Sequence, residues 1–309
     1  MRVAITGVAG FVGANLARTL IEAGHEVLGI DNLAYGVKEH IPRGVRFHLA
    51  DIRDPGIVRL FDGADVAFHL AAKNCISDCQ KDPAETADIN VAGSVNVFEA
   101  ARMAGVRKVI YAESSALYEG SAILPTPETE VRPESFYAVS KLAGRHFAEA
   151  YKRYYGMALT ALRYFCVYGP IQDYRRTIPP VMSAFIIKLL KGERPVIYGS
   201  GRKRRDFIYV DDVNDFHRIC LTDPRTDNKT FNLGSGTNHS ILEIYETICE
   251  LLGTQIEPEF KPDLPGEAQE TLANIGEAGK LGWEPKTDLR TGLERTVAYI
   301  QEEIRLGRI

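Results

Sequence analysis

The stretch of sequence that decides the fold is TGVAGFVG, residues 6–13, which follows the apolar run Val3–Ile5. Its glycines Gly7, Gly10 and Gly13 are spaced Gly-x-x-Gly-x-x-Gly, where a predicted strand passes into a predicted helix. Glycine lets the backbone approach a pyrophosphate closely, and the first turn of a helix supplies free N–H groups and the positive end of its dipole. The stretch therefore predicts a dinucleotide-binding turn.

Short runs rich in Val, Ile and Leu alternate with helical stretches from residue 1 to about residue 165. The predicted strands after the first are Val27–Ile30, Val45–Leu49, Val66–Leu70, Lys108–Tyr111 and Leu159–Leu162. Such alternation is typical of parallel strands joined by crossover helices. The predicted fold class is therefore α/β, with a Rossmann-type doubly wound parallel sheet.

After Gly169 the alternation breaks into a helix, a short strand Val196–Tyr198, a basic segment, and a strand Phe207–Val210 that runs into a helix. We therefore expect a smaller substrate-binding domain that interleaves with the first. The predicted NAD-binding domain spans residues 1–166 with returns around 206–233, and the predicted substrate-binding domain spans 167–205 and 234–309.

Asp31 ends the second predicted strand, close to the ~20-residue offset at which an acid binds the adenosine ribose. Its carboxylate would accept hydrogen bonds from both ribose hydroxyls and would repel a 2′-phosphate. The next residues, Asn32 and Leu33, offer no cation to bind that phosphate. The predicted cofactor is NAD rather than NADP, and the alternative is a simple turn aspartate.

Composition narrows the classes of function. The sequence pI near 6.0 gives no basic field for nucleic acid. The N-terminus begins directly with a predicted strand and the chain has no apolar run of membrane-spanning length, so we expect a cytoplasmic protein without membrane association. Cys75 and Cys79 are the only closely spaced cysteines, and no nearby histidine or second pair completes a zinc set. We expect no metal.

Tyr137 and Lys141 lie four residues apart, on one face of a helix announced by Pro133 and Ser135. The pKa of a free tyrosine is near ~10, and an opposite charge within ~4–6 Å lowers a pKa by roughly 1–3 units. A nearby oxidised nicotinamide would add a second positive charge. The pair therefore predicts a tyrosine that acts as a general base near neutral pH.

Ser114 follows the strand that starts at Lys108, so its hydroxyl falls at the carboxyl end of a parallel strand, where open α/β sheets bind ligands. We expect it to bridge a substrate hydroxyl and Tyr137. The alternative is a capping serine.

Together these motifs resemble the extended short-chain dehydrogenase/reductase family and, within it, the nucleotide-sugar 4-epimerases of the UDP-glucose 4-epimerase type. The motifs that carry the resemblance span nearly the whole chain: Thr6-Gly-x-x-Gly-x-x-Gly13, Asp31-Asn-Leu33, Asp51-Ile-Arg53, His69-Leu-Ala-Ala72, Asn90-Val91, Ser114, Tyr137-x-x-x-Lys141, Arg163-Tyr-Phe165, Arg205-Asp206, Tyr209-Val-Asp-Asp212, Phe231-Asn-Leu-Gly-Ser235 and Leu281-Gly-Trp-Glu-Pro285.

The resemblance implies an NAD-dependent isomerase that inverts carbon 4 of a UDP-hexose through a 4-keto sugar. Tyr137 would take the proton of the 4-hydroxyl, Lys141 would hold the nicotinamide ribose, and Ser114 would orient the sugar. The implied cofactor contacts are Gly7, Gly10, Phe11, Val12, Gly13, Asp31, Asn32, Asp51, Ile52, Leu70, Ala71, Ala72, Asn90, Tyr137, Lys141 and Tyr164. The implied substrate contacts are Ser114, Cys166, Tyr198, Arg205, Glu267 and Thr271.

The chain departs from the family pattern at two expected substrate contacts. Cys166 stands where an asparagine is usual, and Leu264 stands where an arginine is usual. Arg205 is expected to compensate by binding the diphosphate, whereas Arg202 and Lys203 are expected to be solvated. Thr271 aligns with a gate beside the sugar's 2-substituent, and its small side chain implies room for an N-acetyl group.

Several related functions stay open. Ser115 and Ala116 stand where the 4,6-dehydratases carry an Asp-Glu pair, so elimination of water is disfavoured. The alternatives are a UDP-glucuronate 4-epimerase or another nucleotide-sugar epimerase, decarboxylase or reductase. A non-catalytic NAD-binding regulator is disfavoured because Ser114, Tyr137 and Lys141 are all present. The resemblance also suggests a homodimer through the helices near 83–104 and 136–155.

Overall fold

The computed structural model describes residues 1–172, 174–175, 178–263 and 268–309, and the chain divides into two compact units. The first consists of Met1–Gly120, Val131–Tyr164 and Asn214–Asn232, and the second of Ser121–Glu130, Phe165–Val213 and Leu233–Ile309. Segments 121–130 and 206–213 thus fall in the second unit, whereas the sequence placed them with the first. The functions assigned to the two domains stay predictions.

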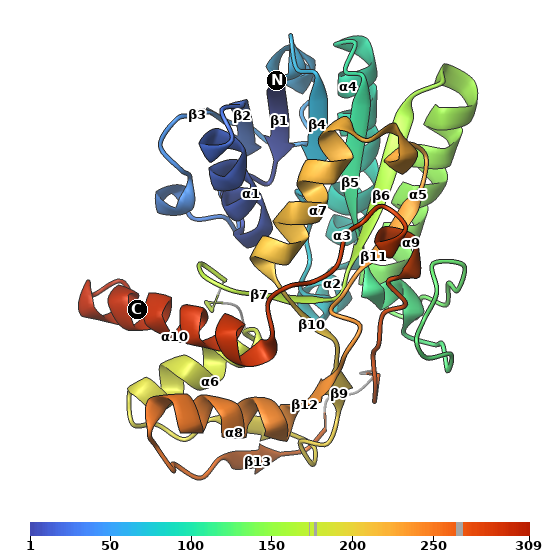
Figure 1. Ribbon diagram of the computed structural model, residues 1–309. Helices are drawn as coiled ribbons and strands as arrows, with labels where there is room; N and C mark the ends of the chain where they lie inside the picture. Colours follow the sequence, from blue (N-terminus) through green and yellow to red (C-terminus); the bar gives the residue numbers. More distant parts are fainter. Residues whose placement is uncertain (173, 176–177, 264–267) are drawn as a thin grey trace. The chain divides into compact units, whose positions relative to one another are not determined.

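The centre of the first unit is a seven-stranded sheet in the order β11-β6-β5-β4-β1-β2-β3 (Figure 1). The strands are β1 (Arg2–Thr6), β2 (Glu26–Asp31), β3 (Val45–Leu49), β4 (Val66–His69), β5 (Lys108–Ser114), β6 (Ala158–Tyr164) and β11 (Thr230–Leu233). Every pairing from β6 to β3 is parallel. The predicted doubly wound sheet is confirmed, and its order reverses between β1 and β4, where open α/β sheets bind ligands.

Helices cover both faces of this sheet (Figure 1). On one face lie α4 (Gly93–Met103) and α5 (Phe136–Tyr155), whose side chains pack against β4, β5 and β6 in one apolar core. On the other face lie α1 (Phe11–Glu22) and α7 (Val210–Thr222), joined by a hydrogen bond from Asn214 to Thr19 of 3.3 Å. The carboxyl ends of the strands are left for the loops that carry the predicted site residues.

Helix α5 begins and ends where its sequence predicts. Ser135 caps the N-terminus, because its hydroxyl accepts a hydrogen bond from the amide of Ala138 at 3.1 Å. Gly156 ends the helix in the left-handed conformation with φ of 67°, which a side chain disfavours. These two signals fix the helix that carries Tyr137 and Lys141.

The single helix expected from Pro83 to Ala104 is wrong in detail. The chain instead forms α3 (Pro83–Ala87), a π-helical turn (Asp88–Ala92) and α4, and the short helix α2 (Ile76–Lys81) precedes them. A π-helical turn inserts extra backbone into a helix and is frequent at functional sites. Here it contains Asn90, whose side chain is buried.

The second unit has its own apolar core, built around α6 (Val181–Leu190), α8 (Ile241–Leu252) and α10 (Leu289–Arg305). Three two-stranded sheets accompany these helices: β7 (Cys166–Tyr168) with β10 (Phe207–Tyr209), β9 (Arg204–Arg205) with β12 (His239–Ser240), and β8 (Val196–Tyr198) with β13 (Glu259–Lys261). Trp283 is buried and donates its indole N–H to the backbone oxygen of Asp212 at 2.9 Å, which anchors the Leu281–Pro285 segment.

The remaining elements are short: η1 (Lys38–His40), η2 (Pro55–Phe61), η4 (Ser115–Tyr118), η5 (Pro224–Thr226) and α9 (Gly276–Gly279). In the described part of the chain, no helix combines the length and the apolar character that crossing a membrane requires.

Gly13→Ala should lower the free energy of unfolding by about 1–3 kcal/mol, because a Cβ at this position would lie 2.1 Å from the carbonyl oxygen of Gly7. Gly144→Ala is the matched control, since a Cβ there meets only the Asn90 carbonyl oxygen at 4.0 Å in the middle of α5. It should be neutral or stabilising. Urea titration of both variants tests this, and equal stabilities would contradict the packing described.

Candidate active site

The glycine-rich turn packs directly against the end of β4. Gly7 has φ of +76°, and a Cβ on it would lie 2.7 Å from the amide nitrogen of Ala71. Gly10 is the N-cap of α1 and has no side chain to cap the amides of Phe11, Val12 and Gly13 in the first turn. The turn, α1 and the Leu70–Ala72 segment therefore meet at the switch point of the sheet. This arrangement fits a pyrophosphate, which needs close backbone and uncapped N–H groups.

Asp31 lies beside that turn with its carboxylate already oriented. One oxygen accepts a hydrogen bond from the amide of Ala9 at 3.0 Å, and the other accepts one from the amide of Leu33 at 2.8 Å. Burial raises the pKa of this carboxyl group, while both backbone hydrogen bonds act to lower it. A carboxylate has about four acceptor positions, so Asp31 keeps capacity for a ribose diol.

Asp51 lies near Asp31 at the surface, and its carboxylate already accepts hydrogen bonds from its neighbours. Asn32 donates its side-chain amide to Asp51 at 2.9 Å, and the guanidinium of Arg53 donates to both Asp51 oxygens. These hydrogen bonds with Arg53 hold the pKa of Asp51 well below its usual range. Ile52, the next residue, is instead buried in the core under α4.

The structure brings Ser114, Tyr137 and Lys141 to the junction of β5 and α5. Ser114 is the last residue of β5, and its hydroxyl oxygen accepts a hydrogen bond from the amide of Ala116 at 3.1 Å. The ammonium of Lys141 donates to the carbonyl of Ala112 at 3.0 Å and lies 5.9 Å from the ring centre of Tyr137. Burial lowers the pKa of Lys141 to about 8, against the opposing charge of Glu113.

Asn90, whose contact with the cofactor stays a prediction, uses its side-chain amide to bind the protein itself. Its oxygen accepts from the amide of Lys73 at 2.8 Å, and its nitrogen donates to the carbonyl of Lys73 at 2.9 Å and to the hydroxyl of Ser140 at 3.0 Å. Ser140 is the neighbour of Lys141 on α5. Asn90 therefore joins the loop after β4 to the helix that carries the tyrosine and the lysine.

A buried hydrogen-bond chain continues from Asn90 to the glycine turn, and sequence reasoning assigned it no role. Ser94 donates to the carbonyl of Asn90 at 2.6 Å, so it accepts from Nε2 of His69 at 2.9 Å. Nδ1 of His69 then accepts from the hydroxyl of Thr6 at 2.8 Å. Burial lowers the pKa of His69 to about 3, which keeps the ring neutral as this pattern requires. Thr6, His69 and Asn90 each stand in a motif quoted from the sequence, but the motifs do not show that these side chains are linked.

Glu119 is a second residue that sequence reasoning missed. Its carboxylate accepts hydrogen bonds from the amide of Ser135 at 2.7 Å, the hydroxyl of Ser135 at 2.9 Å and the amide of Glu134 at 3.1 Å. Glu119 therefore fixes the start of α5 at Ser135, which lies two residues before Tyr137. The cap at Ser135 was readable from the sequence, but its partner on the preceding loop was not.

Tyr164, a predicted cofactor contact at the end of β6, has its hydroxyl 2.8 Å from Nε2 of His217 on α7. The two rings pack edge to face with centres 5.8 Å apart. Burial lowers the pKa of His217 to about 3 and raises that of Tyr164 well above its usual value, so both groups are neutral.

Three predicted substrate contacts gather around one segment of the second unit. Thr271 accepts a hydrogen bond from the amide of Asp206 at 3.2 Å, and the amide of Cys166 donates to the carbonyl of Asp206 at 3.0 Å. Arg205 is the preceding residue, with its guanidinium 3.0 Å from the carbonyl of Arg204. Tyr198 is the last residue of β8, which pairs with β13. Glu267, like Leu264, falls outside the described residues.

The expectation that Lys203 is solvated is wrong. Its side chain is only 6% exposed and forms an ion pair with Asp263, whereas Arg202 is exposed as expected. The lysine is therefore part of the second unit's structure.

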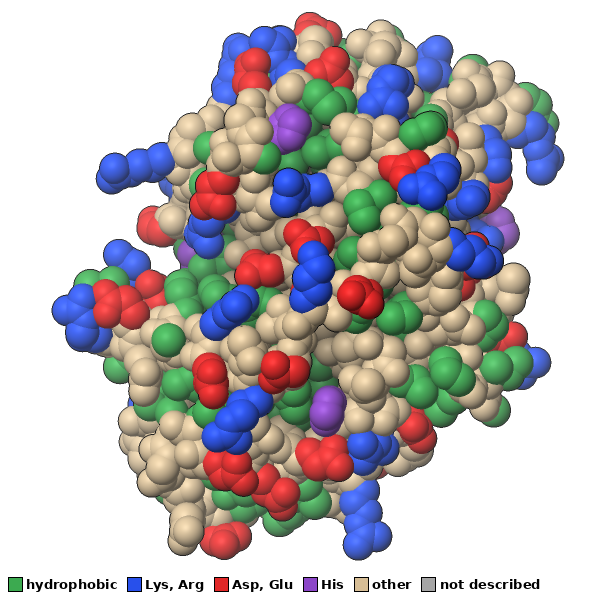
Figure 2. Space-filling model, viewed as in Figure 1, with side chains coloured by type: hydrophobic (Ala, Val, Ile, Leu, Met, Phe, Trp, Pro, Cys, Tyr) green, Lys and Arg blue, Asp and Glu red, His purple; other side chains and the backbone are tan. Residues whose placement is uncertain are grey.

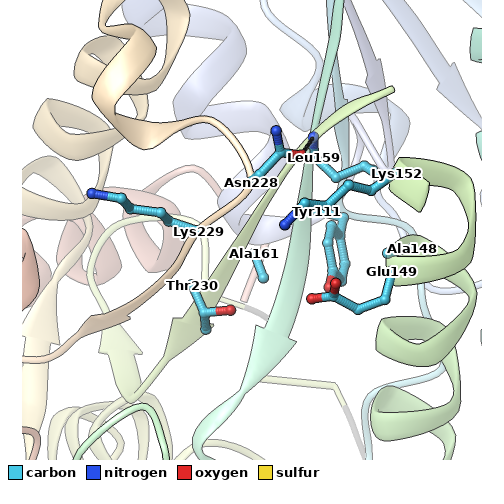
Figure 3. A pocket seen from close by; sticks show the side chains of 9 residues that line it. All are labelled: Tyr111, Ala148, Glu149, Lys152, Leu159, Ala161, Asn228, Lys229 and Thr230. Carbon is cyan, nitrogen blue, oxygen red and sulfur yellow. Dashed lines mark hydrogen bonds between the residues drawn. The ribbon is translucent and has the colours of Figure 1, made fainter. Parts of the chain in front are cut away.

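A small cavity in the first unit lies apart from these residues (Figure 3). Its volume of about 20 Å³ has room for about one water molecule. None of the predicted site residues lines it; the lining residues are Tyr111, Ala148, Glu149, Lys152, Leu159, Ala161, Asn228, Lys229 and Thr230.

Comparison with known proteins agrees with this geometry. Residues 3–234 match the model of the NAD dependent epimerase/dehydratase family. The UDP-glucose 4-epimerase of Mycolicibacterium smegmatis is 34% identical over 98% of this chain and 99% of its own.

Two solved structures are also similar. That of UDP-glucose 4-epimerase from Thermotoga maritima with UDP-glucose has 34% identity and a TM-score of 0.95, covering 98% of this chain and 100% of its own. That of UDP-N-acetylglucosamine 4-epimerase from Methanobrevibacter ruminantium, in complex with UDP-N-acetylmuramic acid, has 30% identity and a TM-score of 0.93, covering 98% of each chain. The chain therefore belongs to the NAD-dependent epimerase/dehydratase family of the extended short-chain dehydrogenase/reductase type, and it is an isomerase whose cofactor is NAD.

Proposed function

We propose that this protein inverts carbon 4 of UDP-hexoses, interconverting UDP-glucose and UDP-galactose through a transient 4-keto sugar. The observation that carries the proposal is the junction of β5 and α5, where Lys141 donates to the carbonyl of Ala112 and lies beside Tyr137, two residues along the strand from Ser114. The relatives that act on UDP-glucose support the choice of substrate.

The roles of these side chains follow from their chemistry. NAD, when bound, supplies the hydride acceptor and donor at carbon 4. Tyr137 takes the proton from the 4-hydroxyl. After the 4-keto sugar has rotated to present its other face, Tyr137 returns the proton to the 4-oxygen, so it acts as base and then as acid. The ammonium of Lys141 stabilises the phenolate. Because the Ser114 oxygen accepts from the amide of Ala116, its hydrogen is directed away from that amide and can hold the sugar oxygen.

The same residues favour retention of the cofactor. We assign the pyrophosphate to the uncapped start of α1, the adenosine ribose to Asp31, and the adenine ring to the neighbourhood of Asp51 and Asn32. The reaction returns every electron that it removes, so one bound NAD serves each cycle. No exchange of cofactor is needed.

Elimination of water is disfavoured by the residues after Ser114. Ser115 and Ala116 start the turn η4, and neither offers a carboxyl group to move a proton at carbons 5 and 6 of the sugar. We therefore propose epimerisation rather than dehydration for this site.

We assign binding of the UDP part to the second unit. Arg205 would bind the diphosphate with its guanidinium, at the end of the substrate where Cys166 is also expected. Tyr198 would stack on the uracil, and Thr271 would line the sugar. Arg205 and Thr271 are both partly exposed, as ligand contacts must be.

We further propose a homodimer in the cytoplasm. The helices α4 and α5 expose large apolar side chains: Met103 at 61%, Val139 at 48%, Phe147 at 44% and Tyr154 at 76%. Exposed apolar groups that gather on neighbouring helices favour burial against a second copy. All the cysteines are free thiols, which suits a reducing compartment.

Purified protein should convert UDP-galactose to UDP-glucose without added NAD, because the cofactor is regenerated in each cycle. The test is incubation with UDP-galactose, UDP-N-acetylgalactosamine and UDP-galacturonate in parallel, followed by chromatographic identification of the products. If only UDP-galacturonate is converted, the substrate is a UDP-uronate and not a UDP-hexose. If a decarboxylated or deoxy sugar is formed, the reaction is not epimerisation.

Tyr137→Phe should lower kcat by roughly 10²–10⁴, the usual size of a general acid–base contribution, while the fold and the bound NAD are retained. Tyr154→Phe is the matched control, since it removes a phenol hydroxyl from the same helix and keeps the apolar ring that the proposed dimer would bury. Turnover is measured together with NAD released on denaturation. Near-normal turnover of Tyr137→Phe would remove the phenol from the mechanism.

Thr271→Tyr should abolish activity on UDP-N-acetylhexosamines and spare UDP-galactose, because the larger ring would fill the space for the 2-substituent. The variant also loses the hydroxyl that accepts from the amide of Asp206. Thr271→Val is therefore the control, since it removes that hydroxyl and keeps the size. The gate assignment is wrong if the wild type lacks N-acetylhexosamine activity, or if Thr271→Tyr keeps it in the wild-type ratio.

A further inference from the structure

A carboxylate is buried next to the candidate active site and has no role in the proposed function so far. Glu113 immediately precedes Ser114 on β5, and its side chain is fully buried. Successive side chains on a strand point to opposite faces, so Glu113 shares a face with Val109 and Tyr111. Those two residues pack in the core that contains α5 residues. Glu113 therefore faces the helix that carries Lys141.

The position of this carboxylate is fixed by its neighbours. Arg163, which pairs with Glu113 across β5 and β6, donates from Nε to the carboxylate at 2.7 Å, and Tyr111 donates its hydroxyl at 2.9 Å. Arg163 donates in turn to the hydroxyl of Tyr118 at 2.6 Å, and Tyr118 donates to Asn232 at 2.6 Å. The charge on Glu113 is therefore held in one place by a polar network inside the first unit.

The ammonium of Lys141 comes close to the same strand, since it donates to the carbonyl of Ala112, the residue before Glu113. The other titratable groups that interact with it are His69 of β4, Cys79 of α2 and Tyr137 on its own helix. His69 is neutral, and burial raises the pKa of the Cys79 thiol, which keeps it protonated. Among these groups, Glu113 supplies the negative charge.

That charge matters because the surroundings of Lys141 favour loss of its proton. Burial lowers the pKa of Lys141 to about 8, only slightly above neutrality, and the charge of Glu113 acts in the opposite direction. A positive nicotinamide nearby would favour loss of the proton further. A neutral Lys141 could no longer stabilise a phenolate on Tyr137.

We propose that Glu113 is a positioning residue that holds the ammonium of Lys141 in its charged form beside Tyr137, with Arg163 and Tyr111 fixing the carboxylate against β5. The inference rests on the proposed roles of Tyr137 and Lys141. It adds Glu113, a charged residue on the face of β5 that packs against α5, to the group formed by Ser114, Tyr137 and Lys141.

The test is Glu113→Gln, which keeps the shape of the side chain and one acceptor oxygen for Arg163 and removes the charge; the hydroxyl of Tyr111 can then accept from the new amide group. The pKa of Lys141 is measured by nitrogen-15 NMR on lysine-labelled, NAD-loaded protein without substrate, with the signal assigned by its loss in Lys141→Met. We expect the variant to lower this pKa by about 1 unit or more. The alkaline limb of the pH profile of kcat for UDP-galactose should move to lower pH by a similar amount, with KM little changed.

Tyr111→Phe is the matched control. It removes one hydrogen bond to Glu113 but leaves the charge, so both the pKa of Lys141 and the alkaline limb should stay at their wild-type values. A shift in Tyr111→Phe equal to that in Glu113→Gln would show that packing rather than charge is responsible, and would overturn the proposal.

If Glu113→Gln leaves the charge of Arg163 uncompensated and does not fold, Glu113→Gln with Arg163→Met removes the ion pair as a whole, a replacement that buried pairs often tolerate. A smaller fall in the Lys141 pKa than in Glu113→Gln is expected in that double variant, because the positive charge of Arg163 is removed together with the negative charge of Glu113. An unchanged pKa would reduce Glu113 to a structural partner of Arg163. A lowered pKa in protein that turns over none of the UDP-sugars would support this inference and contradict the proposed substrate instead.

Discussion

The candidate site depends on the hydrogen bonds that the buried side chain of Asn90 forms. Its amide binds both backbone groups of Lys73 and the hydroxyl of Ser140, so it joins the loop after β4 to helix α5. Through Ser94 and His69 the same chain of hydrogen bonds reaches Thr6 at the glycine turn. The segments that would hold NAD and those that would move the proton are thereby kept in one arrangement. A π-helical turn supplies the extra backbone that places Asn90 there.

Charge is then distributed so that most of this framework stays neutral. His69 and His217 are kept uncharged by burial, and Tyr164 keeps its proton for the same reason. Lys141 is the exception, because it retains a pKa of about 8 and a carboxylate lies on the adjoining strand. Because His69, His217 and Tyr164 carry no charge, they do not compete with the ammonium of Lys141 for a phenolate on Tyr137.

The fold was predictable from the sequence because its signals are local. The glycine turn, the alternation of strands and the capping residue Ser135 each act within a few positions, and the structure has the sheet and helix that they predict. The partners of the site residues are long-range, and single-chain patterns do not show them. The sequence did not predict that the side chain of Asn90 binds Lys73 and Ser140. Lys203 was expected in solvent but pairs with Asp263. Glu113 and Glu119 act on α5 from a strand and a turn that precede it by many residues.

The central claim, that carbon 4 is oxidised and reduced again by one bound NAD, is tested most directly with UDP-galactose carrying deuterium at carbon 4. Purified protein is incubated with this substrate in ordinary water without added NAD, and the UDP-glucose formed is examined by mass spectrometry and NMR. The account predicts that deuterium is retained at carbon 4 of the product, because the hydride returns from the cofactor to the carbon that it left. Loss of deuterium to the solvent, or a reaction that requires added NAD in every cycle, would contradict it.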